Sequence, residues 1–460
     1  MKLAVRLFTA ALALALIALA FADDPYLGGG EGFGWSQAAL LAVGAALGAL
    51  CFGPLAWNAR ALALLISVGL TLSMAELVLR QTLGPRYRTA VELDDRVLYR
   101  LIPGAQREYI RPAINGGARI RYGINSQGFR GEELAPRGQA LRVVVYGDSF
   151  TQAEYAKTED TFAERLEAHL ARRLGTAVEV VNAGVAGYGP DQELRRMEDE
   201  LEGLAPDLAI VAIYAGNDFG DLVRNKMYRL SADGNLSDNA FTLDETYARR
   251  LVVGRNEPIV KKLLRDGLNR LRGDPNDDVP TGHEARLART ESALAQLVAE
   301  YREYVIEGDD VVHELMSDPY NADVSLLPES ESARYRVALM EQIVARMRST
   351  AEAQHVPLLL VLIPTPIDVA DEHESGEVDR ARYPEYRPEA LTDQLERIAA
   401  RSRVPAVNLF APFSARGARE LYLKGVDDHW NELGQDFGAE LVADFVVSEG
   451  LLKARAGGAP

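Results

Sequence analysis

Residues able to carry out acyl transfer are spread along this 460-residue chain. The reaction needs a nucleophile, a base, a group that orients the base and hydrogen-bond donors for the oxyanion. Ser149, in Gly147-Asp-Ser149, follows an apolar run and offers a hydroxyl nucleophile. His429 offers a base, and Asp427, two residues earlier, offers a carboxylate to orient it. These residue types predict a serine-dependent acyl-transfer site.

Two further positions offer donors for an oxyanion. Gly187, in the loop sequence NAGVAGYG, lets backbone approach a reacting centre and has a free N–H to offer. Asn217, between Gly216 and Asp218, offers a side-chain amide. Each motif also has a plain structural reading. Gly147-Asp-Ser149 would serve as a turn and helix N-cap, Asn217 as a turn former, and Gly184 and Gly187 as loop glycines.

Alternating strand and helix patterns must position these residues. Strands are expected at 142–146, 178–181, 208–214, 357–363 and 406–409, and helices near 161–174, 191–201, 332–354, 388–402 and 434–448. This rhythm predicts a doubly wound parallel sheet in a three-layer α/β/α fold. In such a sheet the loops after the strands converge, which would bring Ser149, Gly187 and Asn217 together.

Three other regions interrupt or precede this α/β pattern. Residues 81–140 form a lead-in with little helical periodicity, in which 119–124 alternates like an edge strand. The strand–helix rhythm stops at about 219–331, which we interpret as a mostly helical insertion. The hydrolase-like part would then span 141–450, interrupted by this insertion.

Residues 1–80 are predicted to associate with a membrane. Lys2 and Arg6 lie at the start of a signal-like apolar segment at 3–22. Apolar helices are expected at 37–57, which has no charged residue, and at 61–79, where Glu76 near the end is the one charge. Each segment approaches the roughly 20 residues that cross a bilayer. Three spans, or a cleaved signal and two spans, would place the large domain outside the cytoplasm, whereas exactly two spans starting from the cytoplasm would place it inside. We favour the outside. We therefore expect a protein anchored in a bacterial inner membrane, with its catalytic domain in the periplasm.

Composition excludes several classes of function. The formal net charge is -17 and no long basic stretch is present, which argues against nucleic-acid binding. The one cysteine, Cys51, lies in an apolar segment, so a disulfide or a cysteine nucleophile in the large domain is excluded.

The remaining histidines give no metal motif. Asp371-Glu-His-Glu374 reads as a charged loop, and we predict no metal and no cofactor. Five histidines are expected to be solvated: His169, His283, His313, His355 and His373.

Taken together, the motifs resemble the SGNH (GDSL-type) hydrolase superfamily. The resemblance rests on Gly147-Asp-Ser149, on Gly187, on Gly216-Asn-Asp218 and on the C-terminal Asp/His pair, and it covers about 120–450. It implies that Ser149 is the nucleophile and His429 the general base and acid. It also implies three oxyanion donors, which are the Ser149 and Gly187 N–H groups and the Asn217 side chain.

One departure from the family pattern concerns the orienting aspartate. The usual position, three residues before the histidine, is Val426 here. Asp427 instead matches the Asp-x-His-Trp pattern of SGNH-like proteins that O-acetylate exopolysaccharides such as alginate. Asp428 is the second candidate, although an extended backbone would point it away from the side of Asp427. The segment 124–131, INSQGFRG, is similar to membrane-anchored SGNH proteins associated with bacterial cell-surface polysaccharide.

The sequence therefore predicts a serine-dependent esterase or O-acetyltransferase that acts on an acylated carbohydrate, with polysaccharide-biosynthesis proteins as partners. Two alternatives remain open at this point. The membrane anchor would also suit a lipid esterase or phospholipase. A polysaccharide-binding or assembly subunit with a degenerate site is the non-enzymatic alternative.

Overall fold

The computed structural model describes residues 2–22, 33–87, 89–244, 248, 257–272, 281–312, 318–370 and 373–452. The chain divides into two units by its internal contacts. The N-terminal unit comprises 1–89 and 245–277, and the second unit comprises 90–244 and 278–460. Part of the predicted insertion thus belongs to the N-terminal unit.

The described elements of the N-terminal unit are helical. They are α1 (Lys2–Ala20), α2 (Trp35–Leu50), α3 (Leu55–Thr82), α4 (Gly84–Tyr87) and α10 (Ile259–Arg272). Helices α1 and α3 are long and apolar enough to cross a membrane, whereas α2 is a shorter apolar helix. The segment expected at 37–57 is divided, because Pro54 takes the N-cap position of α3 and residues 55–57 begin that helix.

A five-stranded parallel sheet forms the centre of the second unit, in the order β13-β12-β7-β5-β6. Its strands are β5 (Leu141–Gly147), β6 (Val178–Gly184), β7 (Leu208–Tyr214), β12 (Leu358–Ile363) and β13 (Ala406–Asn408). Every residue of β5, β7 and β12 is buried, as expected for apolar strands covered on both faces. The strand order reverses between β5 and β7, and in open α/β sheets ligands bind beside such a point.

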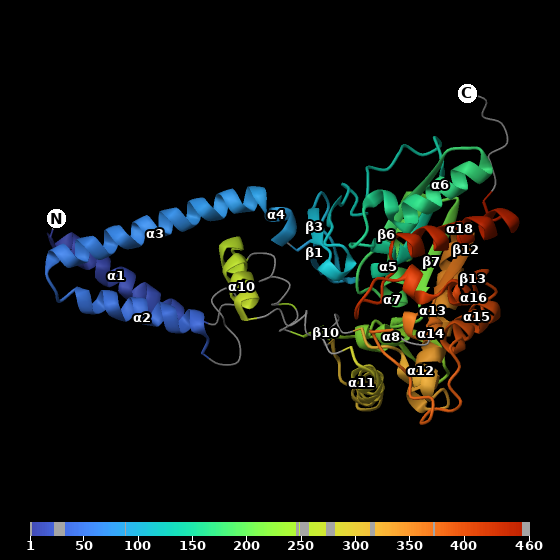
Figure 1. The fold of residues 1–460 in the computed structure, drawn as a ribbon. Coiled ribbons are helices and arrows are strands. Elements are labelled where there is room, and N and C mark those ends of the chain that lie inside the picture. The colour runs from blue at the N-terminus through green and yellow to red at the C-terminus, as the bar shows by residue number, and fades with distance from the viewer. Residues whose placement is uncertain are drawn as a thin grey trace. The chain divides into compact units, whose positions relative to one another are not determined.

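Helices cover both faces of the sheet (Figure 1). Helices α6 (Phe162–Leu174) and α18 (Glu432–Ser448) pack together on one face, and α7 (Pro190–Leu204) and α13 (Glu331–Ala353) pack together on the other. Helix α15 (Ala390–Arg401) packs beside α13. The predicted three-layer, doubly wound parallel fold is confirmed.

Local signals explain where the two helices on the first face begin. The Thr161 hydroxyl accepts a hydrogen bond from the Glu164 N–H at the start of α6, and Gly175 ends that helix with φ +63°. The Asn431 side chain accepts hydrogen bonds from two backbone N–H groups at the start of α18. This cap fixes α18 directly after the segment that carries His429.

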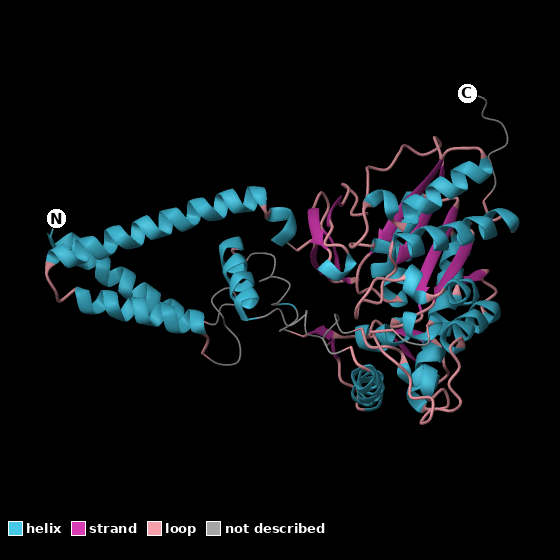
Figure 2. Cartoon of the chain, viewed as in Figure 1, coloured by secondary structure: helices cyan, strands magenta, loops and turns pink. Residues whose placement is uncertain are grey.

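The lead-in forms two antiparallel hairpins outside the main sheet (Figure 2). They consist of β1 (Val91–Asp94) with β2 (Leu98–Leu101), and β3 (Gln106–Ile110) with β4 (Arg119–Gly123). The strand expected at 119–124 is therefore part of a separate hairpin, and does not lie at the edge of the main sheet.

Short elements complete the second unit. Its insertion contains strands as well as helices: α8 (Asp218–Asn225), β8 (Tyr228–Leu230), β9 (Leu236–Asp238), β10 (Thr242–Leu243), α11 (His283–Tyr301), a π-helical turn (Arg302–Ile306), β11 (Val311–Val312) and α12 (Ala322–Leu326). The other short helices are α5 (Ser149–Gln152), α14 (Pro366–Val369), α16 (Phe410–Arg416) and α17 (Ala418–Leu421). Two 3-10 turns lie at Ala113–Asn115 and Thr158–Asp160.

Candidate active site

Ser149 is the first residue of α5, directly after strand β5. Asp148 takes the N-cap position, where its Oδ1 accepts a hydrogen bond from the Phe150 N–H at 2.8 Å. Burial raises the pKa of Asp148 to about 7. The Gly-Asp-Ser motif thus caps a helix and also places a serine hydroxyl at the carboxyl end of the sheet.

His429 lies between Ser149 and Asp427, although Ser149 is far away in the sequence. Its Nε2 is 2.7 Å from the Ser149 Oγ, and its Nδ1 is 2.7 Å from Asp427 Oδ1. The Asp427 carboxylate also accepts a hydrogen bond from the His429 N–H at 3.1 Å. The three side chains have the geometry of a serine–histidine–aspartate relay.

Aromatic rings hold the imidazole in place. The ring of Phe150 lies 4.9 Å from the His429 ring, and the ring of Tyr155 lies 4.6 Å away, between centroids. Desolvation opposes protonation of His429, but the Asp427 hydrogen bond and the nearby carboxylates outweigh it and raise its pKa to about 9. The same pairing lowers the pKa of Asp427 despite its burial.

Asp428 lies beside the imidazole but has a different partner. Its Oδ1 is 3.7 Å from His429 Nδ1, beyond hydrogen-bond distance, while Oδ2 accepts a hydrogen bond from the Tyr214 hydroxyl at 2.6 Å. Tyr214 is the last residue of β7. The geometry therefore assigns the direct hydrogen bond to Asp427 and leaves Asp428 as a nearby negative charge.

The loop that carries Gly187 is tied to the helix of Ser149. Gln152 accepts a hydrogen bond from the Ala186 N–H at 2.5 Å, and Asn182 donates to the Thr151 carbonyl at 2.8 Å. Gly187 has φ +77°, a left-handed conformation that favours glycine. These bonds hold the Gly187 loop at the same carboxyl edge of the sheet as Ser149.

Gly184 is required for a different reason, which is steric. A Cβ at this position would lie 2.3 Å from the Gln152 N and 2.7 Å from the Thr151 carbonyl carbon. Because these are backbone atoms of α5, we expect Gly184→Ala to destabilise the protein by about 1–3 kcal/mol. Thermal unfolding of the detergent-purified full chain measures this. Gly203→Ala in α7 is the matched control, since its Cβ would meet nothing within 4 Å. Equal melting temperatures for the two variants would contradict the steric explanation.

Asn217 has a partner that the sequence did not reveal. It takes the N-cap position of α8, and its side chain lies close to the Asp318 carboxyl, whose charged form the Asn217 amide favours. Asp318 is exposed and precedes α12, within the insertion. The amide predicted to bind an oxyanion therefore lies beside an acidic side chain of the insertion.

Arg130 is a second residue that the sequence analysis did not single out. Its guanidinium donates hydrogen bonds to the carbonyls of Gln152, Ala153 and Ala156, the last at 2.7 Å. It is buried and stacks on the Tyr122 ring. Arg130 thus holds the C-terminal end of the Ser149 helix, and it lies in the segment 124–131 whose resemblance was noted above.

Within the described part of the chain, one group of side chains lies close enough together to bind a metal ion. Asp427, Asp428 and His429 offer ligand atoms within 4.8 Å of one another. The ring nitrogens of His429 already face Asp427 and Ser149. Residues 371 and 372 of the charged loop at 371–374 lie outside the described residues.

The expectation of solvated histidines is wrong for two of the five. His169 is buried against Asp436, with 2.9 Å between Nε2 and Oδ1, and His373 is buried beside Ser375. His283 and His355 are exposed, and His313 lies outside the described residues. His169 is buried because α18 packs against α6, the helix that carries it.

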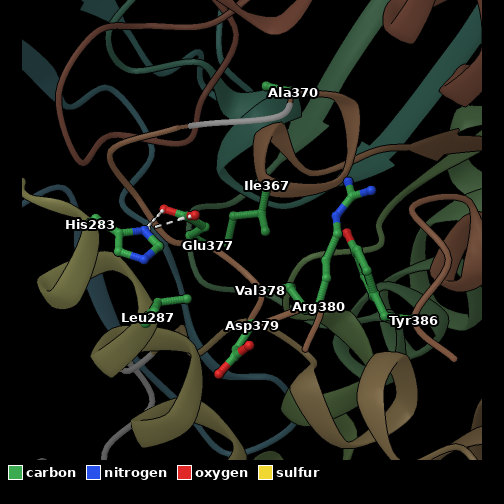
Figure 3. Close-up of a pocket in the computed structure, with 9 residues that line it drawn as sticks. All are labelled: His283, Leu287, Ile367, Ala370, Glu377, Val378, Asp379, Arg380 and Tyr386. Atoms are coloured by element: carbon green, nitrogen blue, oxygen red, sulfur yellow. Dashed lines mark hydrogen bonds and ion pairs between the residues drawn. The ribbon is translucent and has the colours of Figure 1, made fainter. Parts of the chain in front are cut away.

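Two hollows flank the loop that follows α14. The first, of about 330 Å³, lies between α11 and this loop, and there His283 pairs with Glu377 at 3.0 Å (Figure 3). The second, of about 400 Å³, is lined by residues adjacent to the triad segment. Its lining residues are Thr281, Arg286, His373, Glu374, Arg419, Tyr422, Leu423 and Lys424. The Leu423 N–H donates to the His429 carbonyl at 2.8 Å, which joins one lining residue of the second hollow to the backbone of His429.

Solved structures with a similar arrangement have low sequence identity to this chain. An α/β hydrolase from the metagenome of Lake Arreo, LAE5, is 13% identical, with a TM-score of 0.33, and the match covers 68% of this chain and 96% of that one. TesA is 15% identical, with a TM-score of 0.33, covering 68% and 99%. A two-domain esterase active on acetylated mannans is 14% identical, with a TM-score of 0.30, covering 70% and 53%. No curated protein matches the sequence significantly.

Family models match the chain in two successive parts. Residues 145–329 match the GDSL-like lipase/acylhydrolase family. Residues 320–458 match the SGNH hydrolase-like domain of the acetyltransferase AlgX. The first match contains Ser149, Gly187 and Asn217, and the second contains Asp427 and His429. The two models describe a GDSL-like and an SGNH hydrolase-like domain and together cover residues 145–458, and this protein is a member of the SGNH (GDSL-type) hydrolase superfamily.

Proposed function

We propose that this protein is a serine-dependent carboxylic-ester hydrolase or O-acetyltransferase acting on an acylated carbohydrate. The observation that carries the proposal is the relay of Ser149, His429 and Asp427, with two contacts of 2.7 Å. Such a relay activates a hydroxyl that would otherwise be a weak nucleophile.

The reaction proceeds in two halves. The Ser149 Oγ attacks the acyl carbonyl while its proton passes to His429 Nε2, and the carbonyl oxygen becomes an oxyanion. The Ser149 and Gly187 N–H groups and the Asn217 amide stabilise that oxyanion. Collapse expels the alcohol, which takes the proton from His429 and leaves an acyl-enzyme. Water, or a hydroxyl of an acceptor sugar, then attacks the acyl-enzyme with His429 again as base.

A carbohydrate substrate is favoured over a long-chain lipid by the hollow lined by Tyr422, Leu423 and Lys424, shortly before Asp427 and His429 in the chain. Its lining is mainly polar and charged, and includes Arg419, Lys424 and Glu374. A binding site for a long acyl chain would instead be lined by apolar side chains. The similarity to the AlgX domain over 320–458 supports an acetyl group and a polysaccharide.

The test of this proposal compares acyl chain lengths and acceptors. The purified full chain would be given acetate, butyrate and palmitate esters, and separately an acetylated glycan with an unacetylated acceptor glycan. We expect the acetate ester to react fastest, with acetate released or acetyl transferred, as detected by chromatography. A preference for palmitate would support the lipid esterase alternative. Inactivity towards all of these substrates would contradict the proposal.

Asn217 gives a prediction specific to oxyanion binding. Removing one oxyanion donor typically lowers kcat by about 10²–10³-fold, and we expect a loss of this size for Asn217→Ala. Steady-state kinetics on a soluble acetate ester measures it. Asn225→Ala at the other end of α8 removes a buried amide that donates to Asp191 and Gln192 of α7, and it serves as the control for damage to α8. Equal losses for the two variants would show that only helix α8 is affected.

The raised pKa of His429 predicts an alkaline pH dependence. Below its pKa the imidazole is protonated and cannot accept the Ser149 proton, so kcat/KM should rise with pH up to about 9. Asp428→Asn removes a neighbouring negative charge and should move this rise to lower pH. Initial rates across this range, corrected for hydrolysis by the Ser149→Ala variant, provide the measurement. A profile that is flat from pH 6.5 to about 9 would contradict the assignment.

We further propose that the protein is anchored in the bacterial inner membrane, with the hydrolase domain in the periplasm and polysaccharide-biosynthesis proteins as partners. The apolar helices α1 and α3 support anchoring. An alkaline phosphatase fusion at the C-terminus reports the side of the membrane. Enzymatic activity of the fusion in intact cells is the expected result, and an inactive but expressed fusion would contradict it.

A further inference from the structure

The N-terminal unit contains a helix that comes from the middle of the chain. Helix α10 belongs by its contacts to the same unit as α1–α4, although it lies in the insertion between β10 and α11. The chain therefore leaves the hydrolase unit after Asp244, contributes α10 to the N-terminal unit, and returns. The residues that α10 contacts, and those of its residues that stay exposed, indicate what this helix does in the N-terminal unit.

The first turn of α10 is capped by a residue of α3. The Glu76 carboxylate accepts hydrogen bonds from the Ile259 N–H at 3.0 Å and the Val260 N–H at 3.1 Å. Arg80 pairs with the same carboxylate at 2.7 Å. Since a helix begins with unpaired N–H groups, a carboxylate there fixes where α10 starts.

The next turn of α10 is held by α4. The Tyr87 hydroxyl donates to Asp266 at 2.9 Å, and Lys262 Nζ donates to the Tyr87 carbonyl. Lys262 is buried by this contact. Polar contacts at the first turn of α10 and at the following turns therefore attach this helix to the segment 76–87.

The sequence of α3 shows where along this helix α10 is attached. Between Arg60 and Glu76 the helix has no charged residue, and its apolar window has no buried residues within the described structure. Glu76 is thus the first charge after the apolar stretch. If α3 crosses a bilayer, Glu76 lies at the boundary between hydrocarbon and headgroups, and so does the start of α10.

The face of α10 turned away from these contacts is apolar and basic. Leu264 is 66% exposed and Leu268 is 53% exposed, and both lie on one side of the helix. Lys261 and Arg265 lie on the same side, and both pair with Glu257, at 3.2 and 3.1 Å. The three charged groups have a net charge of +1, so the leucines contribute most of the attraction to an apolar phase.

We propose that α10 lies in the lipid–water interface of the membrane that α3 crosses, and so gives the hydrolase chain a second attachment to the bilayer. Leu264 and Leu268 enter the acyl-chain boundary, while Lys261 and Arg265 extend to the headgroups. This combination of exposed leucines and basic residues is the pattern of interfacial helices. The inference rests on the proposed membrane anchoring by α3.

The experiment measures the depth of single cysteines in the full chain. Cys51 is the one native cysteine, so Cys51→Ser provides a background for Leu264→Cys and Leu268→Cys, each carrying an environment-sensitive fluorophore. The protein is reconstituted in phosphatidylcholine vesicles with a nitroxide on the acyl chain of some lipids. Met74→Cys, 63% exposed on α3, reports the membrane span, and Ile306→Cys, 60% exposed in the hydrolase unit, reports the aqueous phase.

We expect strong quenching at 74, 264 and 268, and several-fold weaker quenching at 306. Quenching at 74 without quenching at 264 and 268 would overturn the proposal while leaving the anchor in place. If 74 is not quenched either, the membrane anchoring itself fails. A fluorophore at 264 that is shielded from water but not quenched by lipid nitroxide would show that protein covers this face, which also overturns the proposal. Acetate-ester hydrolysis by each labelled variant confirms that the chain is folded.

Discussion

Replacement of Ser149 by alanine is expected to abolish hydrolysis of a short-chain acetate ester, with a loss of at least about 10³-fold in kcat. Alanine removes the Oγ that lies 2.7 Å from His429 Nε2 and leaves the backbone of α5 intact. His429→Ala is expected to cost about as much, because removing the base leaves the hydroxyl unactivated. Steady-state rates of the purified full chain, with unchanged thermal unfolding, provide the measurement.

A serine outside the site controls for unspecific effects. Ser349 lies on α13, where its hydroxyl donates to the Ala345 carbonyl of its own helix, and Ser349→Ala should retain full activity. In cells, a comparison of Ser149→Ala with deletion of the gene distinguishes the enzyme from the non-enzymatic alternative. If Ser149→Ala left the surface polysaccharide unchanged while deletion of the gene altered it, a binding or assembly role would be the better account.

The second large effect distinguishes the two neighbouring aspartates. Asp427→Asn is expected to lower kcat by about 10⁴-fold, because an amide cannot stabilise the imidazolium and favours the wrong tautomer. Asp428→Asn should lower kcat far less, since the Asp428 carboxylate is 3.7 Å from His429 Nδ1 and its nearer partner is the Tyr214 hydroxyl. The two substitutions are chemically identical and one residue apart, so each controls for the other.

Two outcomes would contradict this assignment. A larger loss for Asp428→Asn than for Asp427→Asn would mean that Asp428 orients the histidine during the reaction. Equal losses would mean that both carboxylates stabilise the imidazolium. Measuring kcat and KM separately identifies either case, because an orienting carboxylate acts on kcat.

The sheet was predictable because its strands are continuous apolar runs with helices between them. Val143 to Tyr146 is one such run, and its burial on both faces is what a central strand of a covered parallel sheet requires. The loops of the site follow from this topology, since parallel strands end at one edge. The position of His429 was predictable from the motif order, but its contact with Ser149 required the packing of α18 against α6.

Other features could not be predicted from local pattern. Asp318 lies in an insertion without periodicity, so nothing near it in the sequence indicates that it lies close to Asn217. Arg130 looked like an ordinary turn residue, and its role depends on carbonyl groups more than twenty residues away. The attachment of α10 to α3 depends on Glu76, which is about 180 residues earlier in the chain. Such contacts join residues far apart in the chain, so the sequence around either residue does not indicate them.

The most direct test of the account is covalent labelling of the nucleophile. The full chain would be treated with an alkyl phosphonate ester that reacts with activated serines, and the modified peptide would be located by mass spectrometry. We expect one adduct on Ser149 in the wild type, none in Ser149→Ala, and much slower labelling in His429→Ala. An adduct on another residue, or an esterase activity that survives when Ser149 stays unmodified, would contradict the proposed mechanism.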